Sequence, residues 1–82
     1  MVMVEITVPS LDKEYDFKLD EHARIDVLIE EIAEVVCRSE QSQLSGDEKQ
    51  LVLCDIAGGY IFEKEKTLYS YGIVNGSKLM LV

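Results

Sequence analysis

Residues 25–36 read Ile25-Asp-Val-Leu-Ile-Glu-Glu-Ile-Ala-Glu-Val-Val36, and the spacing of their apolar side chains decides the fold. The side chains that recur at the intervals of one helical face are Ile25, Leu28, Ile29, Ile32, Val35 and Val36. This spacing predicts an amphipathic helix, and Asp20 is the nearest residue able to cap its start. Burying these side chains is worth on the order of 10 kcal/mol before conformational entropy is subtracted, so the helix must lie on a second apolar layer.

The segment before the helix alternates between apolar and polar residues. The apolar sets are Val2, Val4, Ile6 and Val8 in a first run and Tyr15, Phe17 and Leu19 in a second. A period of two is typical of a strand with one buried face. Pro9, Ser10 and Asp12 separate the two runs as a turn. The pattern therefore predicts an antiparallel hairpin with one solvated face.

The segment after the helix predicts a loop and then short strands. Residues 39–49 are polar and predict a loop in which Leu44 turns inward. Strands are expected at 50–54, 60–62 and 78–82, separated by turns at Gly58-Gly59, Thr67–Ile73 and Asn75-Gly76. The order β-β-α-β-β-β and the crossover rule place the last strand parallel to the first and beside it. We therefore expect residues 1–82 to form one α+β domain of the β-grasp class. Its mixed sheet would have four to five strands, with the helix packed on one face.

Composition limits the partners and the compartment. The chain has 82 residues and a net charge of −8, which disfavours nucleic acid and anionic membrane surfaces. It contains no apolar run long enough to span a bilayer, and its first residues lack the basic start of a signal peptide. Cys37 and Cys54 are 17 residues apart with no CxxC pair, which favours reduced thiols over a disulfide or a metal site. The expected location is the cytoplasm.

The segment Thr67-Leu-Tyr-Ser-Tyr-Gly-Ile73, followed by Asn75-Gly76-Ser77 and an apolar strand, is similar to the end of ubiquitin-like domains. The resemblance implies that Leu68 fills the core, that Tyr71 ties the preceding loop to backbone and that Ile73 is buried. It covers nearly the whole chain and is strongest to the YukD/EsaB group. Members of that group are cytoplasmic accessory proteins of type VII secretion systems in Gram-positive bacteria.

A carrier or conjugated modifier related to ubiquitin needs Gly-Gly at a free C-terminus, because its terminal carboxylate is adenylated. The sequence given stops at Val82, inside the expected last strand, and Gly58-Gly59 is internal. We therefore expect a non-conjugating protein. Two alternatives stay open, namely a sulfur-carrier or conjugation-type protein with a longer precursor, and the soluble cytoplasmic domain of a larger secretion membrane protein.

No residue pattern predicts catalysis, a metal or a cofactor. His22 is the only histidine, and no recognisable motif places a nucleophile beside it, so a solvent-facing loop residue is the simpler interpretation. The acidic residues before the helix alternate with apolar ones, as expected for the solvent-exposed face of a strand; they are Asp12, Glu14, Asp16 and Asp20. Counted from Asp12, the sixth and twelfth positions are Phe17 and Ala23, where a calcium loop needs Gly and Glu. The chain is expected not to be an enzyme.

The sheet face away from the helix is the candidate binding surface. If Leu51, Leu53, Leu79 and Leu81 point inward, alternation sends their neighbours outward. The predicted partner-binding residues are therefore Val52, Cys54, Lys78, Met80 and Val82. A protein partner, a weak homodimer contact and incidental exposure are the three interpretations of this surface, and the first is favoured by the use of this face in ubiquitin-like domains. Residues 12–34 hold nine acids and three bases. Solubility through charge repulsion is the favoured interpretation of this segment, and steering toward a basic partner surface is the alternative. The docking surface of a partner is accordingly expected to be basic or apolar.

Overall fold

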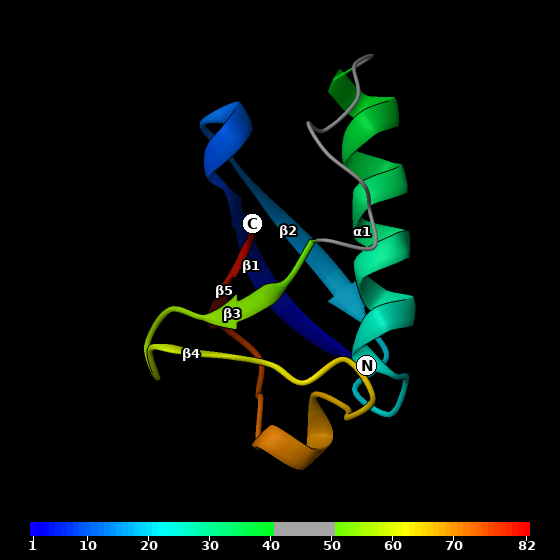
Figure 1. Cartoon of the computed structure of the whole chain (residues 1–82), viewed down its shortest axis with the longest axis vertical. Helices are drawn as coiled ribbons and strands as arrows, with labels where there is room; N and C mark the ends of the chain where they lie inside the picture. The colour runs from blue at the N-terminus through cyan, green and yellow to red at the C-terminus, as the bar shows by residue number, and fades with distance from the viewer. Residues whose placement is uncertain (41–50) are drawn as a thin grey trace.

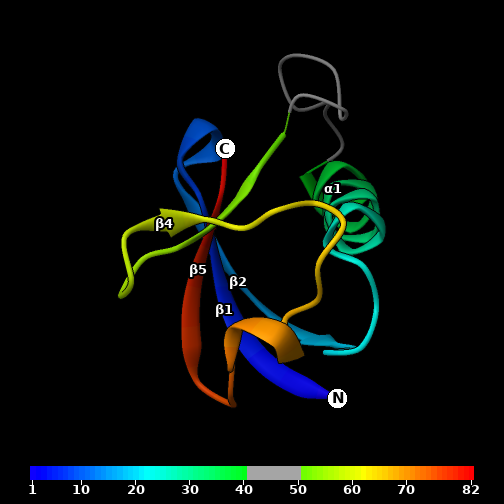
Figure 2. The same cartoon turned by 60° about the horizontal axis from the view of Figure 1, so that its bottom comes forward.

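Five strands form one mixed sheet in residues 1–40 and 51–82, which are the residues that the computed structural model describes. The strands are β1 (Val2–Val8), β2 (Lys13–Leu19), β3 (Leu53–Asp55), β4 (Tyr60–Ile61) and β5 (Ser77–Leu81), and the helix is α1 (Ile25–Glu40). Their order across the sheet is β2-β1-β5-β3-β4. Helix α1 lies on one side of the strands (Figures 1 and 2), and among the described residues no α-helix lies over the other side of the sheet.

The strand directions confirm the predicted β-grasp arrangement. Strand β2 pairs with β1 antiparallel along its whole length, from Val2 opposite Leu19 to Val8 opposite Lys13. Strand β5 runs parallel to β1, as the crossover rule required, with Ile6 opposite Leu79. Strand β3 is antiparallel to both β5 and β4. The sheet therefore has five strands, the upper number expected.

The core lies between α1 and the inner face of the sheet, and the alternation in the sequence predicts its strand side correctly. The buried strand residues include Val4, Ile6, Val8, Leu19, Leu53, Leu79 and Leu81. On the helix, the prediction for Val35 is wrong, because its side chain is 45% exposed while Ala33 is fully buried. Successive helix residues point about 100° apart, so Val35 turns away from buried Val36 while Ala33 falls on the opposite margin of the stripe.

The helix begins without the cap that the sequence indicated. The Asp20 carboxylate accepts a hydrogen bond from the His22 amide, which closes a turn before the helix. The first helical amides, those of Ile25 and Asp26, instead donate to the carbonyls of Lys66 and Lys64 at 2.9 and 3.0 Å. These carbonyls satisfy amides that have no partner within the helix. The far end also differs, because α1 continues through Glu40, where a loop from residue 39 was expected.

The compact turn before β5 has the features that the resemblance implied. Leu68 is fully buried, Ile73 is 8% exposed, and the Tyr71 hydroxyl accepts a hydrogen bond from the Glu63 amide at 2.8 Å. Gly72 ends the short 3₁₀ turn Tyr69–Tyr71 with a φ of 72°, a left-handed conformation that costs glycine little. The strand expected at 50–54 is shorter than predicted and begins further along the chain, as β3 at Leu53–Asp55. Gln50 and Leu44 lie outside the described residues.

Candidate protein-binding surface

The predicted binding residues of β3 and β5 meet on the outer face of the sheet. Leu53 lies opposite Leu81 and both are buried, whereas the next pair, Cys54 opposite Met80, is half-buried and faces away from the helix. Beyond β3, the amides of Val52 and Val82 each donate to the carbonyl of the other, at 2.7 and 3.0 Å. The residue register that the sequence predicted is therefore correct, and four apolar side chains adjoin one another.

A fifth apolar residue of this surface was not predicted. Ile61 lies opposite Cys54 in the β3–β4 pair, so the two share a face of the sheet, and Ile61 is 61% exposed. The signal was its neighbour Phe62, which is buried and bonds through its amide to the Leu53 carbonyl. An inward Phe62 sends Ile61 outward. We call Val52, Cys54, Ile61, Met80 and Val82 the outer patch.

The remaining half of the outer face is charged. Lys78, the fifth predicted site residue, is exposed and lies opposite Glu5 across β5 and β1. Glu5 is next to Asp16 on β2, and Thr7 is next to Glu14. The Glu5 carboxyl hydrogen-bonds to that of Glu14 and repels its negative charge, which raises the pKa of Glu14 above its ordinary value. The outer face is thus apolar over β3, β4 and the end of β5. Over β1 and β2 three of its six outward residues are acidic, and we call this side the acidic half; the other three are Met3, Thr7 and Lys18.

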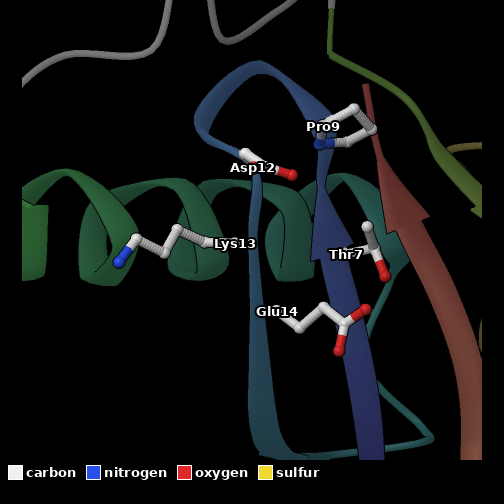
Figure 3. A pocket seen from close by; sticks show the side chains of 5 residues that line it. All are labelled: Thr7, Pro9, Asp12, Lys13 and Glu14. Atoms are coloured by element: carbon white, nitrogen blue, oxygen red, sulfur yellow. The ribbon is translucent and has the colours of Figure 1, made fainter.

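A hollow lies on this acidic half, beside the turn between β1 and β2. It is lined by Thr7, Pro9, Asp12, Lys13 and Glu14, and Figure 3 shows the Glu14 side chain extending from β2 across β1. Thr7 also lies opposite Met80, so the hollow adjoins the outer patch. Its lining carries two carboxylates, those of Asp12 and Glu14, and the ammonium group of Lys13.

The histidine and the two cysteines show no arrangement for catalysis within the residues that the structure describes. His22 is 65% exposed at its side chain and stacks on the Tyr69 ring with 4.8 Å between ring centroids. Cys37 and Cys54 both carry free thiols. Burial raises the pKa of the Cys54 thiol, which disfavours the thiolate that a nucleophile requires. Cys54 therefore contributes apolar surface to the outer patch.

Comparison with known proteins identifies the family. Residues 3–81 match the family model described as "WXG100 protein secretion system (Wss), protein YukD". The chain belongs to the YukD family. No curated protein matches this YukD-family chain, so the assignment comes from the family model. Within residues 1–40 and 51–82, no helix is long and apolar enough to cross a membrane.

Solved structures share the ubiquitin-like fold of this YukD-family chain. The ubiquitin-like domain of EccD5 from Mycobacterium xenopi is 24% identical with a TM-score of 0.77, and the match covers 99% of this chain and 91% of that one. The N-terminal ubiquitin-like domain of the 4931431F19Rik protein is 21% identical with a TM-score of 0.75, over 99% and 72% of the two chains. ATBAG1, solved in complex with HSP70, is 13% identical with a TM-score of 0.74, over 100% and 40%.

Proposed function

We propose that this YukD-family chain is a non-conjugating protein-binding module, and that it serves as a cytoplasmic accessory or regulatory component of a WXG100 (type VII) secretion system. Residues 1–82 act as one domain, the outer patch docks on a partner protein, and the chain catalyses no reaction. The observation that carries the proposal is the contiguity of five apolar side chains on the sheet face opposite α1.

The size of the outer patch suits a docking surface. Five medium-sized side chains on adjacent strands expose a few hundred Å² at most, the range in which apolar patches on small proteins tend to be functional. Covering about 300 Å² of apolar surface is worth roughly 7 kcal/mol before the cost of association. Such a contact is adequate for a reversible complex.

The charge of the chain favours a neutral or basic partner. Acidic residues flank the outer patch on β1 and β2, and the exposed face of α1 carries Glu30, Glu31 and Glu34. Complementary charge on the partner would orient the encounter and raise the association rate, while the apolar contact would set the lifetime of the complex. Nucleic acid and membrane insertion are outside this proposal.

A second candidate is that the domain acts as part of a larger secretion component. The similarity to a ubiquitin-like domain of EccD5 favours it, because that structure is described as a domain. The intact mass of the protein isolated from its native host separates these candidates. The same mass tests the carrier or conjugation alternative, which needs a mature chain ending in Gly-Gly.

Secretion of WXG100 proteins by the native host tests the proposed function. Host cells would carry Ile61→Asp or Met80→Asp in place of the wild-type chain. Val74→Asp is the matched control, because Val74 is 63% exposed and Ile61 is 61% exposed. Val74 precedes the first residue of β5, whereas Met80 lies near the last residue of that strand. We expect both patch variants to reduce secretion at normal protein levels and the control to leave it unchanged. Normal secretion by both patch variants would contradict the proposal.

A further inference from the structure

The sheet has two edges of very different length. Strand β4 forms one edge with only two residues, Tyr60 and Ile61, whereas β2 forms the other with seven. In the sheet that residues 1–40 and 51–82 form, β2 has β1 as its single neighbouring strand (Figure 1). A long edge strand presents backbone donors and acceptors to a further strand, whereas a two-residue edge offers little to pair with.

We propose that β2 pairs antiparallel with β2 of a second copy of this chain, in a register centred on Asp16. Centring on Asp16 is the symmetric register that overlaps all seven residues from Lys13 to Leu19. It places Glu14 opposite Lys18 of the second copy, and Tyr15 opposite Phe17 of the second copy. The product is a ten-stranded sheet with both helices on one face.

Charge complementarity supports a second copy as the occupant. The chain as a whole carries −8, but β2 holds two lysines and two acidic residues and is neutral. Its charged side chains would discourage pairing if like charges faced each other, yet self-pairing forms two Glu14–Lys18 ion pairs. In the single chain Glu14 lies beside the Glu5 carboxyl, which repels it, and also within the field of Lys78. Turning toward Lys18 of the second copy would move Glu14 away from the Glu5 carboxyl while keeping a lysine beside it.

The inner face of β2 adds an apolar contact. Tyr15 and Phe17 are half-buried, and their ring centroids lie 6.2 Å apart. Both pack against the core of their own chain and keep part of their surface exposed. Aromatic residues that face each other across antiparallel strands contribute roughly 0.2–1 kcal/mol per pair.

The register centred on Asp16 contains one unfavourable contact, and this contact distinguishes it from the neighbouring registers. Asp16 faces Asp16 of the second copy, and removing this repulsion should strengthen the pairing. Moving the centre to Tyr15 would place Glu14 opposite Asp16 twice. Moving it to Phe17 would leave Lys13 and Glu14 without partners inside the strand. The outer patch lies on β3, β4 and β5, away from this edge, so the pairing is independent of the proposed docking function.

Sedimentation equilibrium of the full chain at low salt tests the proposal, over roughly 10 µM to 1 mM, the range suited to a small interface. We expect a monomer–dimer equilibrium for the wild type. Glu14→Lys should weaken it about tenfold, because like charges then face each other twice. The swap Glu14→Lys with Lys18→Glu should restore it, and Asp16→Asn should strengthen it.

Glu31→Lys on the exposed side of α1 is the control, since it makes the same charge change away from the edge. It should dimerise at least as well as the wild type, because it lowers the net negative charge. A monomeric wild type across this range would overturn the proposal. Equal dimerisation of the wild type and Glu14→Lys, or a charge swap that fails to restore pairing, would overturn the register. Met80→Asp should dimerise like the wild type, which separates this test from that of the outer patch.

Discussion

The Tyr71 hydroxyl accepts a hydrogen bond from the backbone amide of Glu63, and this bond holds the loop on which α1 begins. The carbonyls of Lys64 and Lys66, in the same loop, accept the first amides of the helix from Asp26 and Ile25. The Tyr71 ring also lies 4.6 Å from that of Phe62, centroid to centroid, at the start of the loop. One tyrosine therefore connects the turn before β5 to the start of the helix.

Tyr71→Phe should lower the free energy of unfolding by about 1 kcal/mol, because it removes one hydrogen bond and keeps the ring contacts. Urea unfolding measures the loss, and amide hydrogen exchange should quicken at Glu63, Ile25 and Asp26. Tyr69→Phe is the control, since Tyr69 is 67% exposed and lies in the same turn. Equal stability of the two variants would show that the bond contributes nothing to holding the loop.

Val36→Ala and Val35→Ala should differ although they are adjacent and chemically identical. Val36 is fully buried, so truncation should lower the free energy of unfolding by roughly 1.5–3 kcal/mol. Val35 is 45% exposed, and alanine has the higher helix propensity, so its substitution should leave stability within about 0.5 kcal/mol of the wild type. Thermal or urea unfolding of both variants checks the orientation of α1, and a larger loss at Val35 would contradict it.

Glu5→Gln should lower the pKa of Glu14, because the carboxyl that hydrogen-bonds to it and repels it is gone. The pKa of Glu14 in the folded wild type is raised, so its contribution to stability is present at acid pH and lost as pH rises through that raised pKa. Above the raised pKa of Glu14 the wild type has lost this contribution. The free energy of unfolding of Glu5→Gln should therefore exceed that of the wild type above this pKa and not at acid pH. NMR titration of the Glu14 side chain, with unfolding measured at acid and neutral pH, tests both statements. Glu31→Gln, on the exposed face of α1, should show no such pH-dependent gain.

The strand pattern and the family resemblance predicted most of the fold because their signals are local. Alternation across β1 and β2 and the buried positions of β5 follow from side-chain direction in a pleated strand. The start of α1 was not predictable in this way, since the acceptors for its first amides lie about 40 residues further along the chain. Val35 was misassigned because a residue at the margin of a helical stripe is buried or exposed according to the neighbouring layer.

The candidate site was predicted in its centre and missed at its edge. Leu53, Leu79 and Leu81 had to be buried, which sent Cys54 and Met80 outward together. Ile61 belongs to a strand of two residues, too short to show a period, and its place follows from the pairing with Cys54 and from the buried Phe62 beside it. The acidic half of the same face also required the sheet order, because Glu5 and Glu14 are adjacent only once β1 and β2 are paired.

Capture of host proteins by the immobilised chain tests the central claim, that the outer patch is the docking surface. Wild type, Ile61→Asp, Met80→Asp and the control Val74→Asp would be compared by quantitative mass spectrometry, with the thermal midpoint of each variant measured alongside. We predict a protein that the wild type and the control retain and that both patch variants lose, with all midpoints within a few degrees. Retention of the same proteins by both patch variants would contradict the claim.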